Sequence, residues 1–417
     1  MEIQKPRGTL DFEGLAQQKK SFISYTFDTL CRDLGFTQIT TPLFERKDLY
    51  VRSVGDDSDI VEKELFELEN KSENSYVLRP ELTAGIVRSL AEGGARGRQL
   101  PIFYYSIGEI FRYDKPQKSR YRQSSQLDME IFGASDPITD VFLINTISLF
   151  FRRLNVNKKI IFNINTLGST ETKIAYSKKL VIYLEKNTDY LCADCQRRMT
   201  KNPLRVLDCK QEQCKKIASS SPSIYDSLTD QEKADFKKIV EGLETLKIPF
   251  NIDQTLVRGL DYYTGLIFEV NSEDDKERKL SIGGGGRYDR LVSELSGNDL
   301  AACGYGLGIE RIIDLLEFDV DEKRAERKKI IIIPTSEKQK VNCIKIQNKL
   351  IEKDNSLVFS YLKKSSLSDA LSYASKYGYD LAVIAGDEEE KQGKFILKDL
   401  KKNSQVTMSE EEVSNIV

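Results

Sequence analysis

The 417-residue sequence contains no histidine and no tryptophan. Without an imidazole, the chain has no side chain whose ordinary pKa lies near neutral pH, so no histidine can act as base, proton shuttle or metal ligand. Ser-His-Asp and Cys-His nucleophilic mechanisms are therefore excluded. Because tryptophan is missing as well, a general drift in composition is one explanation for the lack of histidine.

Long apolar runs and a charge imbalance are also missing. No run approaches the roughly 20 apolar residues that span a bilayer, and the first residues, MEIQKPR, lack the apolar core of a secretory signal. We therefore expect a cytoplasmic protein that does not bind membranes. With 63 basic and 65 acidic residues, overall charge does not indicate a nucleic-acid partner, so any such surface must be a local patch.

The seven cysteines do not form a disulfide framework, because Cys31, Cys303 and Cys343 are scattered along the chain. The other four lie close together in the sequence. They are Cys192, Cys195, Cys209 and Cys214. The first two form a Cys-x2-Cys pair, a common half of a zinc site, and four thiolates would give a closed structural site. The alternative is four free thiols in a helical segment.

Hydrophobic patterning predicts two parts joined by a charged linker at 319–329. In the first part we expect helices at 14–34, 81–92, 137–154 and 308–316, and strands at 36–41, 76–79, 102–110, 129–132, 266–270 and 279–283. Residues 168–250 are helical and Lys-rich, which indicates an insertion into one sheet. In the second part, strands at 330–334, 357–362 and 380–385 alternate with helices at 336–353 and 367–378, which predicts a small α/β domain with a largely parallel sheet.

Three glycine-containing segments hold residue types suited to a ligand. Residues 256–265 read LVRGLDYYTG, and the alternative to a binding segment is a turn with packed tyrosines. Residues 283–289 begin with four glycines, which allow a backbone to approach a ligand closely, although a flexible hairpin loop is the alternative. Residues 304–311 read GYGLGIER; their glycine spacing is weak evidence by itself.

Two further segments begin at the ends of predicted strands. Residues 111–122 carry three arginines and two lysines, which suits a triphosphate or an RNA end, or else a solvated basic hairpin tip. Residues 78–85 pass from a strand end into a helix start, where Glu81 would favour the helix dipole.

In their order and spacing, these segments together resemble the histidyl-tRNA synthetases, a class II aminoacyl-tRNA synthetase family. Residues 256–265 and 284–289 are similar to the family's own two signatures, and residues 111–122 and 304–311 to class II motifs 2 and 3. Residues 36–42 resemble motif 1, a dimer-interface element, and residues 5–11 resemble the family's N-terminal segment. The resemblance runs along nearly the whole chain.

The resemblance implies an α+β fold in which helices flank an antiparallel class II sheet. It implies a catalytic domain at 1–325, a helical insertion within it at 168–250, and an α/β anticodon-binding domain at 329–417. The implied activity is ligation of L-histidine to tRNA(His), with ATP as substrate, Mg²⁺ as cofactor and a homodimer as the working form. A structural Zn²⁺ on the four clustered cysteines is a further expectation.

Roles for single residues are also implied by the resemblance. Arg112 and Arg258 are implied to grip the α-phosphate of ATP, together with Asp114, Arg120 and Arg311 elsewhere on the nucleotide. The implied histidine pocket consists of Glu81, Thr83, Gln126, Glu130, Tyr262, Tyr263 and Tyr288. Since the substrate carboxylate is already a nucleophile, fixed guanidiniums and Mg²⁺ can supply positioning and charge stabilisation without an imidazole.

Four positions depart from the family pattern. Asp114 replaces a glutamate, and Asp128 replaces a glycine common in bacterial members. Ser124-Ser125 replaces Phe-His, which removes the aromatic platform for adenine. By analogy with base stacking in nucleic-acid complexes, this change would weaken ATP binding by roughly 1–3 kcal/mol.

Two other functions remain open from the sequence alone. One is a non-catalytic, synthetase-like regulatory subunit of ATP phosphoribosyltransferase in histidine biosynthesis. Such subunits typically lack the C-terminal domain and the Arg258 signature, both of which this chain has. The other is an RNA-binding protein on the same scaffold, for which a complete amino-acid pocket would have no purpose.

Overall fold

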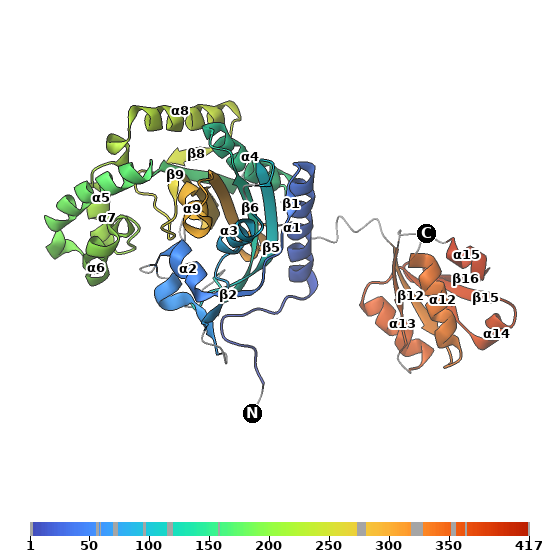
Figure 1. The fold of residues 1–417 in the computed structure, drawn as a ribbon. Coiled ribbons are helices and arrows are strands. Elements are labelled where there is room, and N and C mark those ends of the chain that lie inside the picture. Colours follow the sequence, from blue (N-terminus) through green and yellow to red (C-terminus); the bar gives the residue numbers. More distant parts are fainter. Residues whose placement is uncertain are drawn as a thin grey trace. The chain divides into compact units, whose positions relative to one another are not determined.

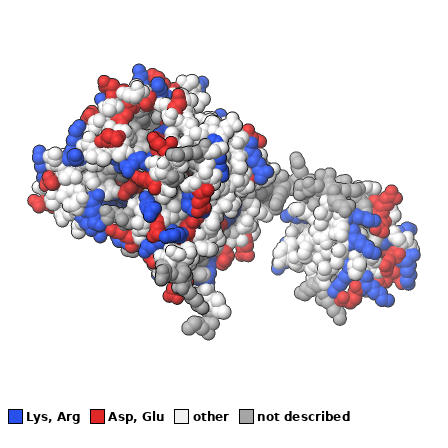
Figure 2. All heavy atoms as spheres, in the orientation of Figure 1, with Lys and Arg blue, Asp and Glu red and all other residues white. Residues whose placement is uncertain are grey.

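A computed structural model describes residues 3–415 except 56–57, 59, 70–73, 95–96, 115–119, 157–158, 273–280, 318–327, 352–355 and 363–364. The chain forms two compact units, Met1–Glu317 and Phe318–Val417. Figure 1 shows the helices and strands of each unit. Figure 2 shows basic and acidic side chains interspersed on the visible face of both units, in keeping with the balanced overall charge.

An eight-stranded sheet organises the N-terminal unit (Figure 1). In spatial order its strands are β1 (Thr37–Gln38), β5 (Ile102–Phe111), β6 (Gln123–Phe132), β11 (Ala302–Gly308), β10 (Ser281–Arg287), β9 (Thr264–Ser272), β7 (Ile160–Thr166) and β8 (Phe250–Ile252). The two edge pairs, β1 with β5 and β7 with β8, are parallel. All pairs between them are antiparallel, which confirms the expected class II sheet.

Two long helices, α1 (Gly14–Asp33) and α4 (Pro137–Arg153), cover one face of this sheet. Phe27 of α1 is fully buried. Its ring contacts Phe150 of α4 edge to face, at 5.4 Å between centroids, and Tyr105 of β5 and Tyr305 of β11 at 6.1 and 6.5 Å. Aromatic packing therefore fixes both helices on the central strands.

Shorter elements cover the opposite face. These are α2 (Lys47–Val54), α3 (Thr83–Glu92), α9 (Asp289–Ser296) and a three-stranded sheet of β2 (Phe44–Arg46), β4 (Tyr76–Leu78) and β3 (Phe66–Leu68). The short helix α10 (Ile309–Ile313) instead packs against α1. Leu82 and Ile86 beside and within α3 share a buried cluster with Leu291 of α9 and Phe132 of β6. The candidate site lies on this face.

The region at 168–250 is helical, as expected. It contains α5 (Thr170–Glu185), α6 (Ala193–Lys201), α7 (Glu212–Ser219), α8 (Asp230–Thr245) and a 3-10 turn at Pro203–Val206. These elements leave the sheet after β7 and return to it at β8. Thr229 and Glu232 form a capping box at the start of α8, with backbone and side-chain groups satisfying each other.

The C-terminal unit is an α/β sheet in the order β13 (Ser356–Ser360), β12 (Lys328–Pro334), β14 (Leu381–Ala385), β15 (Lys394–Asp399) and β16 (Ser404–Ser409). Its helices are α12 (Gln339–Ile351), α13 (Leu367–Lys376), α14 (Asp387–Glu390) and α15 (Glu410–Ser414). Ile330 and Ile332 of β12 pack in one buried cluster, whereas Ile331 and Ile333 pack in another. Both faces of β12 are therefore covered, which explains its uninterrupted apolar run.

The expectation of a largely parallel sheet was right for β13, β12 and β14 and wrong for the last two strands. Strands β15 and β16 form an antiparallel hairpin on β14. Asn403 adopts a positive φ of 51° at the turn. Because β16 is exposed and largely polar, its sequence does not stand out as an apolar run.

Several predicted boundaries changed. The four glycines expected at a strand end or in a loop lie inside β10, β1 is only two residues long, and α10 ends at Ile313 rather than near 316. The expected linker at 319–329 and the start of the strand at 279–283 lie largely outside the described residues. Among the described helices, none combines the length and apolar character needed to cross a membrane.

Candidate active site

The floor of the candidate site is formed by β6 and β11. Alternation along a strand places Gln126, Asp128 and Glu130 on one face of β6, while Leu127 and Met129 turn to the other face. On the neighbouring strand β11, Gly308, Gly306 and Gly304 pair with these three polar residues in register. Three polar side chains are thus presented side by side over three glycines.

The glycines of β11 make room for those side chains. A Cβ on Gly304 would lie 1.5 Å from Glu130 Oε2, and a Cβ on Gly306 would lie 1.7 Å from Gln126 Nε2. On β10, a Cβ on Gly284 would lie 2.6 Å from an Arg258 nitrogen and 2.4 Å from the Phe268 backbone oxygen. These glycines therefore allow close packing of strands and side chains inside the sheet, and not the bending of a loop.

The implied histidine-binding residues come together at this floor. Tyr288 donates a hydrogen bond to Glu130 Oε2, and the Tyr262 ring lies 5.6 Å from the Tyr288 ring and 4.7 Å from the Tyr263 ring between centroids. Glu81 accepts a hydrogen bond from the Ala84 backbone at 3.0 Å, at the start of α3, where Thr83 is also buried.

Several buried polar atoms at the site have no hydrogen-bond partner among the described residues. They are Gln126 Oε1, Asp128 Oδ1, Glu130 Oε1 and Arg258 Nε. A buried polar atom without a partner is costly. A bound polar molecule that donates to these oxygens would therefore relieve that cost.

Burial governs the charge of the acidic floor. It raises the pKa of Glu130 to about 7, although hydrogen bonds with Asp128, Thr83 and Tyr288 oppose this shift. Burial likewise raises the pKa of Asp128 well above its usual range, helped by the neighbouring Glu130 carboxyl, and raises the pKa of Glu81. The floor therefore accepts a proton or a cationic group readily.

Four arginines gather above the floor: Arg112, Arg120, Arg258 and Arg311. Burial lowers the pKa of Arg311 to about 10, and the nearby charges of Arg112 and Arg120 act in the same direction. Arg112 is oriented by donating to the Pro80 carbonyl at 2.8 Å, and Arg258 by an ion pair with Glu269 at 3.1 Å. Such a cluster of like charges suits a polyanion.

One cavity of about 360 Å³ connects the arginines to the floor. Its lining includes every residue expected for histidine or ATP binding except Glu130, which accepts a hydrogen bond from the lining residue Tyr288. Arg112, Arg258 and the tyrosines therefore face the same space. The basic segment at 111–122 is described only in part, since 115–119 lie outside the described residues.

Position 124 opens directly onto this cavity, as do Asp114 and Tyr121. The adjacent Ser125 is buried and donates its backbone N–H to both oxygens of Glu310 at 3.0 Å. Its hydroxyl donates to Glu109 at 2.8 Å. Ser125 thus joins β6 to α10, whereas Ser124 leaves the cavity without an aromatic ring at that point.

Two residues of the helical region also line the cavity, and the sequence patterns did not reveal them. Arg205 lies in the 3-10 turn, with a nitrogen 2.9 Å from where a Cβ on Gly259 would sit, and Asp208 lies shortly after it. Their only sequence signal is their place between the second and third clustered cysteines.

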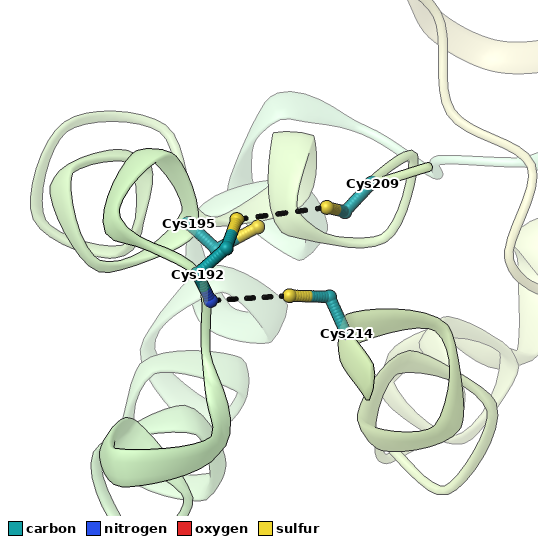
Figure 3. A group of neighbouring side chains, drawn as sticks. All are labelled: Cys192, Cys195, Cys209 and Cys214. Carbon is teal, nitrogen blue, oxygen red and sulfur yellow. Dashed lines mark hydrogen bonds between the residues drawn. The ribbon is translucent and has the colours of Figure 1, made fainter. Parts of the chain in front are cut away.

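The four clustered cysteines meet in space, as Figure 3 shows. Their sulfur atoms all lie within 4.8 Å of one another. Cys195, Cys209 and Cys214 are buried, and Cys192 is half-buried. The sequence expectation that these residues share one site is therefore met by the geometry.

Two family models match the chain. The class II tRNA synthetase core domain (G, H, P, S and T) matches residues 66–317, and an anticodon binding domain matches residues 329–417. The histidine–tRNA ligase of Acetivibrio thermocellus is 39% identical over 412 residues, covering 98% of each chain. That of Thermotoga maritima is 39% identical over 407 residues, covering 97% of this chain and 96% of the relative.

A solved structure is similar over the same extent. The S. aureus histidyl-tRNA synthetase superposes with a TM-score of 0.79 at 27% identity, covering 99% of both chains. The core sheet, the cavity residues and the relatives matched over nearly their whole length all indicate the same family. The chain belongs to the histidyl-tRNA synthetases, the histidine–tRNA ligase family of class II aminoacyl-tRNA synthetases.

Proposed function

We propose that this protein ligates L-histidine to tRNA(His) in two steps. First the histidine carboxylate attacks the α-phosphorus of ATP, so that a P–O bond forms to the carboxylate and the bond to pyrophosphate breaks. Then the terminal ribose hydroxyl of the tRNA attacks the carbonyl carbon of the adenylate, and AMP leaves. The observation that supports this most strongly is that Arg112, Arg258 and Gln126 line one cavity together with Tyr262, Tyr263 and Tyr288.

Each group of side chains has a task in the first step. Glu130 and Tyr288 would hold the substrate imidazole, because one offers an acceptor and the other a hydroxyl at the same place. Arg112 and Arg258 would stabilise the charge that builds on the α-phosphate, with Arg120, Asp114 and Arg311 on the rest of the nucleotide. No protein imidazole is needed, since the attacking carboxylate is already deprotonated.

The cofactors are proposals of the same kind. Mg²⁺ would enter with ATP, and it prefers oxygen ligands such as carboxylates. Glu269 and Glu310 line the cavity and provide such carboxylates beside the arginines. Besides ATP and Mg²⁺, we propose a structural Zn²⁺ bound by the four clustered cysteines.

Domains, assembly and location complete the proposal. Residues 1–325 would act as the catalytic domain, 168–250 as an insertion near the tRNA acceptor end, and 329–417 as the reader of the anticodon. The motif 1-like segment at 36–42 would join two copies, and the exposed Leu43 and Phe44 beside it support such a contact. We propose a cytoplasmic homodimer.

The alternative of a regulatory subunit receives less support. The C-terminal unit has two buried clusters of its own, and Arg258 pairs with Glu269 at the cavity. A chain that had lost catalysis would have no need of either. The alternative of an RNA-binding protein also receives less support, because RNA binding alone gives no role to the buried polar oxygens of the floor.

Histidine-dependent exchange of pyrophosphate into ATP tests the proposal. We expect exchange with histidine and with no other amino acid, and a fall of roughly 100-fold or more in Arg258→Gln, because a fixed charge on the reacting phosphate is lost. Arg153→Gln is the matched control, since Arg153 forms a surface pair with Asp33. Absence of exchange with histidine would refute ligase activity.

A further inference from the structure

The four cysteines are spaced for a metal and not for disulfides. A tetrahedral zinc with Zn–S bonds of about 2.3 Å holds its sulfurs about 3.8 Å apart. The sulfurs of Cys192 and Cys209 are 3.9 Å apart, and all four lie within 4.8 Å of one another (Figure 3). All seven cysteines of the chain are free.

The backbone supports negative charge at this cluster. The Cys192 N–H donates to Cys214 Sγ at 3.3 Å (Figure 3). Cys192 caps α6, and Cys195 and Cys214 lie in the first turns of α6 and α7. Helix N-termini stabilise thiolates.

The local sequence also offsets the charge of such a site. Four thiolates around one Zn²⁺ carry a net charge of −2. Between Cys192 and residue 216 the chain has seven Lys or Arg against three Asp or Glu. The stretch of chain that supplies the ligands therefore has a net positive charge, opposite in sign to that of the site.

We propose that these four cysteines bind one Zn²⁺, and that this ion holds Arg205 and Asp208 at the wall of the active-site cavity. The second part rests on the proposed function. The chain leaves the cluster at Cys195, passes through α6 and the 3-10 turn, and returns at Cys209. Arg205 and Asp208 lie on that closed loop, and Asp208 directly precedes a ligand.

Direct contacts join this loop to the signature segment at 256–265. Asn202 donates to the Asp261 carboxylate at 2.6 Å, and Arg205 lies against Gly259. From α5, Lys173 donates to the backbone oxygens of Asp261 and Tyr263 at 2.8 and 3.2 Å. Residues of the helical region therefore contact the signature segment through hydrogen bonds and packing.

Apolar packing connects the same parts. Cys195, Cys209 and Cys214 belong to one buried cluster that also contains Leu204, Val206, Leu256, Val257, Tyr262 and Tyr263. Loss of the metal would leave buried thiols in place of a rigid centre. The 3-10 turn would then lose its anchor on both sides, and Arg205 would leave its place beside Gly259.

Metal analysis of the full-length protein tests the first part of the proposal. We expect about one zinc per chain after purification without chelators, and far less in Cys209→Ser. Cys343→Ser is the matched control, because Cys343 is equally buried in α12 and remote in sequence from the cluster. Replacement by Co²⁺ should give the absorption bands of a tetrahedral thiolate site. Metal-free protein that binds no added zinc under reducing conditions would overturn the site.

A double-mutant cycle tests the second part. We expect Cys209→Ser and Arg205→Ala each to slow histidine-dependent pyrophosphate exchange by roughly tenfold or more, as misplaced binding groups do. The double variant should be no slower than the worse single variant, because both changes displace the same arginine. Multiplied effects would mean that zinc acts only on stability, which would refute the positioning role.

If Cys209→Ser does not fold, extraction of zinc from the wild-type protein tests the positioning role without a substitution. Wild-type protein stripped by a chelator should lose exchange activity and regain it when zinc is added back. An unchanged rate in stripped protein would overturn the positioning role. Zinc-loaded wild-type protein with the cobalt spectrum but no exchange would instead contradict the proposed ligase activity and leave the metal site standing.

Discussion

At the scale of single residues, the site concentrates charges that a polyphosphate can offset. Arg311 illustrates this, because burial and the charges of Arg112 and Arg120 lower its pKa to about 10. Phosphate oxygens bound among these arginines would offset the repulsion between their charges. In the mechanism that we propose, guanidiniums would supply the electrostatic stabilisation, so that no protein imidazole is required.

Position 124 offers a test of how adenine is held. We predict that Ser124→Phe lowers the KM for ATP in the exchange reaction, because a ring facing the cavity can stack on the base. Stacking worth about 1–3 kcal/mol corresponds to a change of roughly five- to 150-fold. Steady-state exchange at varied ATP concentration measures it.

Ser124→Leu is the control for this prediction, since it adds apolar volume without a ring. An equal gain in the leucine variant would show that stacking is not the cause. If neither variant changes the KM, the half-buried Tyr121, which lines the same cavity, already supplies the platform.

Stability should depend on pH through Glu130. Its pKa is raised by burial from 4.5 to about 7, so its contribution to the free energy of unfolding is fully present below pH 4.5. That contribution is lost as the pH rises through 7, and amounts to about 3 kcal/mol at most. We predict that Glu130→Gln loses less stability than wild type between pH 5 and pH 8, as measured by urea unfolding.

Glu294→Gln, an exposed change on α9, should keep the wild-type pH dependence. The raised pKa values of Asp128 and Glu81 act in the same direction, so a smaller slope should persist in Glu130→Gln. Identical slopes for Glu130→Gln and wild type would show that Glu130 does not titrate in this range.

At the scale of elements, apolar periodicity predicted most helices and strands but failed at the site. Strand β6 extends back to Gln123, beyond the predicted start at 129, because its polar face lines a cavity instead of a core. Strand β10 was expected to be a strand end or loop, since glycine is depleted in strands. The cavity accounts for the residue types of β6, and close packing against the neighbouring strands accounts for the glycines of β10.

The candidate site itself could be predicted only where motifs mark it. The residues assigned through the resemblance do converge on one cavity and its floor. Arg205 and Asp208 could not be found, because they approach from a distant helical region whose docking depends on tertiary packing. Asp128 was noted in the sequence as a departure from the family pattern. Its hydrogen bond from Gln126 at 3.2 Å could not be predicted, because the predicted strand began only at residue 129.

The glycines of β11 provide a test at this scale. We predict that Gly304→Ala destabilises the N-terminal unit by about 1–3 kcal/mol, because its Cβ would overlap Glu130 Oε2. Histidine binding should weaken in parallel, since Glu130 must move. Urea unfolding and calorimetric titration with histidine measure the two effects.

Gly97→Ala is the control here, since a Cβ at that position meets nothing within 4 Å. Loss of stability without loss of histidine affinity in Gly304→Ala would argue that Glu130 does not contact the substrate. Equal behaviour of the two alanine variants would rule out the steric role of Gly304.

At the scale of the whole molecule, the balanced charge leaves recognition of tRNA to local surfaces (Figure 2). Each unit has its own buried clusters, and ten residues between them, 318–327, lie outside the described part of the chain. The absence of histidine from the chain suggests a hypothesis about how the protein is synthesised when histidine is scarce. An enzyme that makes histidyl-tRNA and contains no histidine could be synthesised when that amino acid is scarce.

We predict that synthesis of this protein continues under histidine limitation while synthesis of histidine-containing proteins of similar length falls. The reason is that ribosomes translating its message never wait for histidyl-tRNA. Pulse labelling during starvation measures the difference, and starvation for lysine provides the control. An equal decline under histidine limitation would favour drift in composition.

The floor formed by Glu130 and Tyr288 has a practical consequence for spectroscopy. In most proteins, imidazole resonances of the polypeptide obscure those of a bound amino acid. Here, even in a uniformly labelled complex or in proton spectra of an unlabelled one, every imidazole signal would come from the bound histidine, because the chain has no histidine. The tautomer and protonation state that this pocket selects could therefore be observed directly, without mutating or masking any residue of the protein.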